Sequence, residues 1–332
     1  MKQLIDNYGR KHDYLRISVT DRCNLRCIYC MGPEGVESMP HKNILSYEEI
    51  LQVVQCGAEM GISKIRLTGG EPLVRKNITY LVREIASIPG INDLSMTTNG
   101  ILFSRHAREL HDAGLHRINI SLDTLDSDSY YHITRGGDLQ QVMDGIDAAL
   151  ELGMEPLKLN VVLMKGLNHH EVPNFLDLAY RRNVNIRFIE YMPIGEHDKE
   201  YDSRYLPLDY IKKTALKEGY KLADKGNPRG AGPAQYFSLY GGKGSIGLIH
   251  SISKHFCSSC NRLRLTADGR LKSCLYWQEE ANVRPALETP EKLKALMQDV
   301  ITRKPKEHMM GTENDDGCVD RAAMRNMSRT GG

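Results

Sequence analysis

The sequence predicts an α/β protein: an open, partial (βα)6 barrel of the TIM type, with a small C-terminal module that carries a cysteine triplet and closes the open side. Six short strand-like runs alternate with helix-length amphipathic segments up to about residue 190, and two tight cysteine triplets lie far apart along the chain. Six βα units in succession imply a parallel sheet with right-handed crossovers, two units short of a closed eightfold barrel. We place the barrel at residues 1–235 and the module at residues 236–332.

The barrel strands are predicted from short runs in which every second residue is apolar. These runs are Leu15–Val19, Lys64–Thr68, Asp93–Thr97, Arg117–Ser121, Leu157–Leu163 and Asn185–Ile189. The clearest helix begins at Ser46, where S-Y-E-E forms a capping box with Glu49, and ends near Gly61. Gly114 and Gly153 mark the ends of two further helices, because glycine commonly follows a last helical turn.

The alternation of strands and helices stops past residue 190. Gly, Pro and charged residues dominate 195–235, where we expect one helix near 207–219. Residues 236–275 are expected to form short strands around the second cysteine triplet. The sequence therefore predicts a change of architecture in its last third.

The composition is that of an ordinary globular protein, with 41% hydrophobic and 26% charged residues and a net charge of +2. This charge argues against a broadly basic nucleic-acid binder, and no apolar run approaches the roughly 20 residues of a membrane span. The first residues lack the apolar core of a secretory signal, so we expect a cytoplasmic protein. Eight cysteines in such a chain favour metal binding over a disulfide framework.

The predicted strands of the barrel each have one polar face. Arg16, Arg66 and Lys158 lie on this face, together with Ser, Thr and Asn residues of the neighbouring strands, and only the sixth strand breaks the pattern. The apolar face must meet the helices, so the polar face must point into the barrel. An interior of this kind is a wet cavity for a large polar ligand, unlike the packed aliphatic interior of a TIM barrel.

The first cysteine triplet, Cys23, Cys27 and Cys30, follows directly on the first strand, where barrel enzymes place their chemistry. Three thiolates can bind three irons of a [4Fe–4S] cluster and leave the fourth iron open, since such a cluster normally takes four cysteines. The alternative is structural zinc, which needs four closed ligands. His12 and His41 are possible fourth ligands, but neither lies at the spacing of a zinc knuckle.

The spacing C-x3-C-x2-C after a first barrel strand resembles the signature of the radical S-adenosylmethionine superfamily. The resemblance implies that the open iron takes the amino and carboxylate groups of S-adenosylmethionine, and that one electron from the cluster yields a 5′-deoxyadenosyl radical. It also implies cofactor contacts at Tyr29, at Gly70 within G-G-E-P, at Ser121 and at Met192. As lone residues, these four also suit purely structural roles.

The second triplet, Cys257, Cys260 and Cys274, has the spacing C-x2-C-x13-C and no obvious fourth ligand. A zinc ribbon would show a second C-x2-C, so the triplet predicts a second cluster with one open iron, with zinc as the alternative. Cys56 lies in a helical pattern and is expected to be a buried packing thiol. Cys318 lies in a polar tail and is expected to be a surface thiol.

Arg262 and Arg264 lie on one face of a short strand between these cysteines. If the module closes the open side of the barrel, they join the cations of the polar face in one cavity. Buried unpaired cations are costly, so a polyanion such as a nucleoside triphosphate is expected to enter. No P-loop motif is present, and side chains must therefore bind the phosphates. The alternative is that these cations lie on a face exposed to solvent, where their charges need no anionic partner.

Together these motifs resemble, nearly end to end, the family of molybdenum cofactor biosynthesis protein A, the GTP 3′,8-cyclases. The resemblance includes R-L-T-G-G-E-P-L, T-T-N-G, S-L-D, R-F-I-E-Y-M, C-x2-C-N-R-L-R-L-T-A-D-G and the final Gly-Gly. It implies GTP contacts at Arg16, Arg66, Thr97, Lys158, Arg262, Leu263 and Arg264, with guanine on the open iron of the second cluster.

By the same resemblance, the radical removes hydrogen from C3′ of GTP and the sugar radical attacks C8 of guanine. An electron and a proton then complete 3′,8-cyclo-7,8-dihydro-GTP. The family also implies a homodimer, an electron donor, transfer of the product to cyclic pyranopterin monophosphate synthase, and a tail, Gly331 and Gly332, that reaches toward the active site. Thr330 stands where an apolar residue is expected.

Two other classes of protein compete with this interpretation. Another radical enzyme with an auxiliary cluster, such as one that modifies peptides, would usually carry more C-terminal cysteines and no group of phosphate-facing cations. A two-cluster electron carrier or a structural zinc protein would need neither the polar interior nor an open iron.

Overall fold

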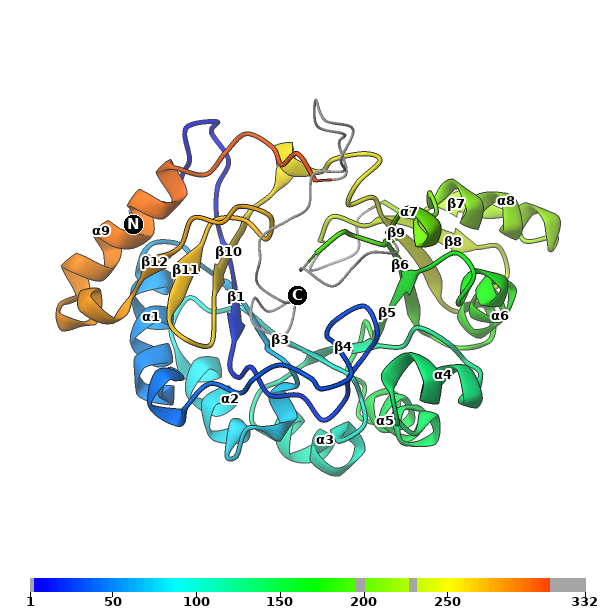
Figure 1. Cartoon of the computed structure of the whole chain (residues 1–332), viewed down its shortest axis with the longest axis horizontal. Helices are drawn as coiled ribbons and strands as arrows, with labels where there is room; N and C mark the ends of the chain where they lie inside the picture. Colours follow the sequence, from blue (N-terminus) through cyan, green and yellow to red (C-terminus); the bar gives the residue numbers. More distant parts are fainter. Residues whose placement is uncertain (1–2, 195–200, 227–231, 311–332) are drawn as a thin grey trace.

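A curved, mostly parallel sheet forms the centre of the molecule, and helices cover its outer face (Figure 1). The structure is a computed structural model that describes residues 3–194, 201–226 and 232–310. The described strands form one sheet in the order β12-β11-β10-β1-β2-β3-β4-β5-β6-β9-β8-β7.

The six predicted barrel strands are confirmed, and their ends lie within one residue of the prediction. They are β1 (Tyr14–Ser18), β2 (Lys64–Thr68), β3 (Asp93–Thr98), β4 (Arg117–Ser121), β5 (Lys158–Leu163) and β6 (Asn185–Glu190). Each strand pairs in parallel with the next, as consecutive βα units require.

The helices also begin and end where local sequence directs them. They are α1 (Tyr47–Glu59), α2 (Ile78–Ser87), α3 (Phe103–Asp112), α4 (Ser127–Thr134), α5 (Leu139–Glu151), α6 (Val172–Arg181), α7 (Tyr201–Arg204), α8 (Asp209–Lys217) and α9 (Pro290–Thr302). The predicted capping box precedes α1: the Ser46 side chain accepts from the Glu49 amide at 3.1 Å, and the Glu49 carboxylate accepts from the Ser46 amide at 2.7 Å. Gly114 and Gly153, with φ of 102° and 66°, follow α3 and α5 as predicted.

Short 3-10 helices connect several of these elements. They are η1 (His41–Asn43), η2 (Pro72–Val74), η3 (His169–Glu171), η4 (Cys257–Ser259) and η5 (Arg284–Glu288). Two of them carry functional motifs, because η2 contains the proline of G-G-E-P and η4 begins with the first cysteine of the second triplet.

The C-terminal strands extend the barrel sheet on both edges. They are β7 (Leu222–Asp224), β8 (Gln235–Leu239), β9 (Ser245–Ile249), β10 (Arg262–Leu265), β11 (Arg270–Lys272) and β12 (Ala281–Asn282). Strand β10 pairs in parallel with β1, and β9 pairs in parallel with β6. Among the described residues β7 and β12 do not pair with each other, so the sheet stays open. The domain boundary near residue 235 stays a prediction.

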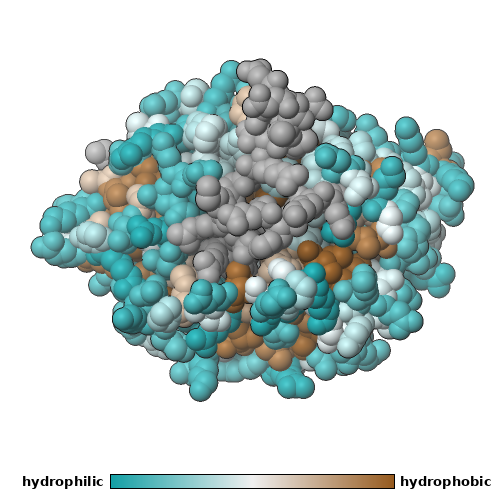
Figure 2. Space-filling model, in the orientation of Figure 1, coloured by the Kyte–Doolittle hydropathy of each residue, from teal (hydrophilic) through white to brown (hydrophobic). Residues whose placement is uncertain are grey.

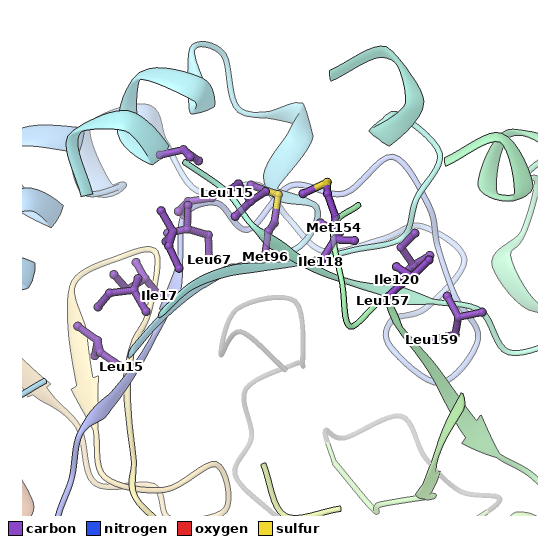
Figure 3. Packing of buried hydrophobic residues seen from close by; sticks show 14 of the residues in the cluster. Leu15, Ile17, Leu67, Met96, Leu115, Ile118, Ile120, Met154, Leu157 and Leu159 are labelled. Carbon is purple, nitrogen blue, oxygen red and sulfur yellow. The ribbon is translucent and has the colours of Figure 1, made fainter. Parts of the chain in front are cut away.

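The apolar faces of the barrel strands pack against the helices, as the alternating pattern predicts. Leu15, Ile17 and Leu67 are fully buried, and Figure 3 shows them with Met96 and Ile118 on the helix side of the sheet. Burying each such side chain is worth about 1.5–3 kcal/mol. The polar residues between them therefore face the interior of the barrel. The outer surface visible in Figure 2 is also largely hydrophilic.

Within the described ranges, every helix is too short or too polar to cross a lipid bilayer.

Candidate active site

The first cysteine triplet lies on the loop that follows β1. The Cys30 amide donates to the Cys27 carbonyl at 2.9 Å, and this turn brings the thiols together. Burial raises the pKa of the Cys27 thiol well above its usual range, and the nearby Cys30, Asp123 and Cys23 raise it further. Three partly buried free thiols that repel one another as anions suit a metal centre, whose positive charge would stabilise the thiolates.

Hydrogen-bond donors surround the sulfur of Cys23. The Leu25 amide lies 3.4 Å from its Sγ, and the side-chain amide of Asn99 lies 3.8 Å away. Donors of this kind stabilise metal-bound thiolates and tune the cluster that they hold. The residues present therefore fit an iron–sulfur cluster.

The two glycines of G-G-E-P let this loop lie against the loop that carries the cysteines. A Cβ on Gly70 would lie 2.3 Å from the Arg22 carbonyl oxygen, and one on Gly69 would lie 2.5 Å from the Thr20 oxygen. Gly69 also has a φ of +151°, which favours glycine. These glycines thus let G-G-E-P lie directly against the backbone of Thr20 and Arg22, and this contact holds the loop of the first triplet in place.

Two buried carboxylates lie beside the same loop. Glu71 accepts from the Thr98 hydroxyl and the Asn99 amide, both at 2.7 Å, and burial raises its pKa to about 7. Asp123 accepts from the Tyr29 hydroxyl at 2.6 Å, and burial raises its pKa to about 6. Groups with raised pKa values gather at functional sites, where a cationic ligand would restore their charge.

The other residues expected to contact S-adenosylmethionine lie in different surroundings. Ser121 ends β4 opposite Asn160 of β5. Met192 follows β6 and packs on the small apolar cluster of Ile194 and Tyr276, which Cys274 also contacts. The structure thus brings Tyr29 beside the first triplet and places Met192 next to the second.

A cavity of 240 Å³ opens beside the first cysteine loop. Its lining includes Asp21, Arg22, Cys23, Arg26 and Met31. The cavity gives the loop access to a small polar ligand, and the charged groups around it suit one that carries both a cationic and an anionic end.

The second triplet converges where β10 and β11 meet η4. The Cys260 amide donates to the Cys257 carbonyl at 3.1 Å, and burial raises the pKa of the Cys257 thiol, with Cys274 and Cys260 adding repulsion. Cys260 behaves differently: burial opposes its ionisation, but Arg262 and Lys304 outweigh burial and lower its pKa to about 6. This lowered pKa favours the thiolate form of Cys260, which is the form that binds metal.

Two histidines lie beside this triplet, and the sequence spacing did not reveal them. Potential ligand atoms of His255, Cys257 and His308 lie within 4.8 Å of one another, and the two imidazole rings lie 4.3 Å apart. Atoms this close suit a single ion, so the zinc alternative for this triplet acquires specific candidate ligands. His308 comes from the segment after α9, which only the tertiary fold brings to η4.

The cations of the polar strand faces meet inside the barrel. Arg16 lies in register with Arg66 on one side and with Arg264 on the other, because β10 pairs with β1. Burial of the guanidinium lowers the pKa of Arg16 well below its usual range, and Arg264 and Arg66 lower it further. The C-terminal module thus brings its own arginine beside those of the barrel.

Lys158 and Arg187 complete this group of cations. Lys158 is 1% exposed, and burial followed by repulsion from Arg187, Arg117 and Arg66 lowers its pKa to about 6. In the described part of the chain, Lys158 Nζ, Arg16 Nε and Arg187 Nε have no hydrogen-bond partner. Buried donors without acceptors are costly, so this interior fits a polyanion. Arg187 was missed from the sequence, although Asn185-x-Arg187 continues the polar alternation.

The remaining predicted contacts have distinct placements. Thr97 accepts from the Asn119 side chain at 3.3 Å on the polar face. Arg262 lies over the Phe256 ring at 4.7 Å, whereas Leu263 is fully buried, so only its backbone is available to a ligand in the interior. Buried Cys56 belongs to the main core, which confirms its packing role. Cys318, Thr330, Gly331 and Gly332 lie outside the described residues.

Two family models together match most of the chain. Residues 17–179 match the radical SAM superfamily, and residues 184–310 match Molybdenum Cofactor Synthesis C. A curated GTP 3′,8-cyclase of Listeria monocytogenes serotype 4b is 50% identical over 333 residues and covers 100% of both chains. The GTP 3′,8-cyclase of Lactiplantibacillus plantarum is 47% identical, also over 100% of both chains.

Solved structures with low identity share the fold. Streptococcus suis SuiB matches with a TM-score of 0.59 at 14% identity, over 90% of this chain and 68% of that one. Native anSMEcpe with bound AdoMet matches with a TM-score of 0.55 at 14% identity, over 84% of this chain and 80% of that one. These likenesses support an open α/β barrel.

Proposed function

Since the chain belongs to the GTP 3′,8-cyclases of the radical SAM superfamily, we propose that it converts GTP to (8S)-3′,8-cyclo-7,8-dihydroguanosine 5′-triphosphate, the first step of molybdenum cofactor biosynthesis. The observation that carries this proposal is the buried group of cations, with unpartnered donors on Arg16, Lys158 and Arg187, in a barrel that bears two cysteine triplets. Neither an electron carrier nor a zinc scaffold requires such an interior.

The first triplet would hold a [4Fe–4S] cluster with one iron left for S-adenosylmethionine, and together they would supply the 5′-deoxyadenosyl radical that removes hydrogen from C3′ of GTP. Cys23, Cys27 and Cys30 bind the other three irons. Tyr29, held by its hydrogen bond to Asp123, contacts the adenine end of the cofactor. Gly70, Ser121 and Met192 are proposed as its further contacts.

The interior of the barrel binds and orients GTP. Charge-assisted hydrogen bonds to its phosphates are worth roughly 1.5–3 kcal/mol each, and the unpartnered donors of the interior supply them. The proposed contacts are Arg16, Arg66, Thr97, Lys158, Arg187, Arg262, the Leu263 backbone and Arg264. With the triphosphate fixed there, the sugar and base extend toward the two triplets, and the enclosed site keeps water from the reacting carbons.

The second triplet, Cys257, Cys260 and Cys274, would hold another [4Fe–4S] cluster, with one iron left for guanine. An electron and a proton complete the cyclised nucleotide after C8 is attacked. We further propose that the protein acts in the cytoplasm as a homodimer, takes electrons from an external electron donor, and passes its product to cyclic pyranopterin monophosphate synthase. The tail, Gly331 and Gly332, is proposed to reach the site.

An anaerobic assay tests this function. The protein is reconstituted with iron and sulfide, and then mixed with S-adenosylmethionine, GTP and a chemical reductant. We expect 5′-deoxyadenosine and the cyclised nucleotide in equal amounts, and loss of both when Cys27 is replaced by Ala. GTP-dependent 5′-deoxyadenosine without a cyclised nucleotide would refute the cyclase assignment. Metal analysis of the same sample distinguishes iron from zinc.

A further inference from the structure

Lys304 is a buried lysine that points at the second cysteine triplet. Its side chain lies just beyond α9, and the residue is only 3% exposed. The Nζ atom donates to the Cys260 Sγ at 3.3 Å and to the Arg262 carbonyl oxygen at 2.8 Å. Lysine is rarely buried to this extent without specific partners, so these two acceptors account for its position.

The backbone around Lys304 is held in place from two sides. Its amide donates to the Ile301 carbonyl at 3.0 Å, at the end of α9. Arg10 donates to the Pro305 carbonyl at 2.7 Å and to the carbonyls of Lys306 and Cys257, both at 2.8 Å. One arginine thus ties the backbone that follows Lys304 to the backbone of Cys257, where the triplet begins.

Arg10 is itself held by a buried acid. The Asp6 carboxylate accepts from the Arg10 Nε at 2.5 Å, and His12 Nε2 lies 3.0 Å from the same oxygen. Asp6, Arg10 and His12 lie in the N-terminal segment that precedes β1. Its role in the arrangement is to anchor the arginine that orients both Lys304 and Cys257.

The sulfur of Cys23, in the first triplet, has donors of another kind. They are the Leu25 amide and the Asn99 side-chain amide, and both are neutral. Cys260 thus differs from Cys23 in accepting a hydrogen bond from a charged side chain.

We propose that Lys304 raises the reduction potential of the cluster held by Cys257, Cys260 and Cys274 through its hydrogen bond to the Cys260 sulfur. One-electron reduction adds negative charge to the cluster and its thiolates. A buried cation bonded to one of these sulfurs stabilises the reduced state more than the oxidised state. Lys304 acts through Cys260 and is thus a positioning residue. The inference rests on the proposed function only in requiring an iron–sulfur cluster at this triplet.

The test is a redox titration of the reconstituted full-length protein, followed by electron paramagnetic resonance and without GTP. In Lys304→Met, the ratio of reduced to oxidised second cluster at a fixed potential is expected to fall about tenfold, which is about 59 mV for a one-electron couple. The first cluster serves as the internal reference and keeps its potential. Lys304→Arg is expected to retain most of the wild-type potential. Lys292→Met, at an exposed lysine of α9, is the matched control and leaves both potentials unchanged.

An unchanged potential in Lys304→Met with full iron content would overturn the proposal. If this variant loses its second cluster, the wild-type protein labelled with 15N-lysine provides the test. A weak 15N coupling to the reduced second cluster is then expected, and a spectrum without it would overturn the proposal. Because the potentials are measured without GTP, a failed cyclase assay and an unchanged potential are separate results.

Discussion

Replacing Lys158 by Met removes a buried amino group from the interior of the barrel. Burial and repulsion from Arg187, Arg117 and Arg66 lower the pKa of Lys158 to about 6 in the free protein. At pH 8 this side chain is therefore largely uncharged in the free protein, because the pH lies above that pKa. A bound triphosphate supplies negative charge beside Nζ and raises the pKa again. GTP binding at pH 8 is therefore expected to take up about one proton.

Isothermal titration calorimetry in buffers of different ionisation enthalpy measures this proton. The wild-type protein, reconstituted but not reduced, is expected to show an uptake of about one proton per GTP at pH 8. GTP itself contributes little at pH 8, because the last phosphate pKa is about 6. Lys158→Met is expected to abolish the uptake and to weaken GTP binding roughly 10- to 150-fold, from the loss of about 1.5–3 kcal/mol.

Lys243→Met, at an exposed lysine in the turn before β9, is the matched control and keeps both the affinity and the uptake. A wild-type protein that binds GTP at pH 8 without proton uptake would refute the reasoning, as would an undiminished uptake in Lys158→Met.

The pH dependence of the stability of the free protein offers a second check. The folded-state pKa of Lys158 lies below the ordinary 10.5, so the unfolded chain binds more protons between about pH 6 and 10.5. Stability contributed by this group thus rises with pH across that window, and Lys158→Met removes the rise.

Three further predictions concern the loops and the cysteines. Burial raises the pKa of Glu190, but hydrogen bonds from the loop after β9 outweigh burial and lower it to about 2. The ionised Glu190 carboxylate therefore stabilises the fold above about pH 4.5, and this stabilisation is lost as the pH falls toward 2. Glu190→Gln is expected to lower the free energy of unfolding by about 1.5–3 kcal/mol at pH 7 in urea titrations, and an unchanged value would contradict this. Gly70→Ala is expected to reduce the iron bound at the first triplet, because the added Cβ would lie 2.3 Å from a backbone oxygen. Gly32→Ala is the control and is expected to keep its iron, because its Cβ would lie 3.4 Å from the flexible Glu34 side chain. Cys274→Ala is expected to retain about half of the iron, with the S-adenosylmethionine-dependent signal intact, and complete loss would argue against two independent clusters.

Local patterns determined most of the barrel, so the sequence predicted it well. The period-two alternation in β1 and β2 depends only on neighbouring residues, and it identified both the strands and the face that carries Arg16 and Arg66. The capping box at Ser46 fixed the start of α1 for the same reason. Arg187 was within reach of this method, because it lies two residues after Asn185 on the same face of β6.

Contacts between distant segments could not be predicted in this way. The pairing of β10 with β1 depends on the complete sheet, and it is this pairing that puts Arg264 beside Arg16. Lys304 and His308 follow α9 in a stretch with no motif, and only the tertiary fold brings them to the second triplet. Sequence spacing shows the ligands of a metal site that lie close along the chain, whereas it does not show the side chains that tune or compete with them.

The account depends most directly on the open iron of the second cluster. Pulsed electron paramagnetic resonance of the reduced second cluster, with 15N-labelled GTP and unlabelled protein, tests it. We expect a strong 15N coupling from the guanine that disappears when unlabelled GTP replaces the labelled nucleotide. A strong nitrogen coupling that instead follows 15N-histidine in the protein and persists with saturating GTP would show that His255 or His308 occupies that iron, and would contradict the account.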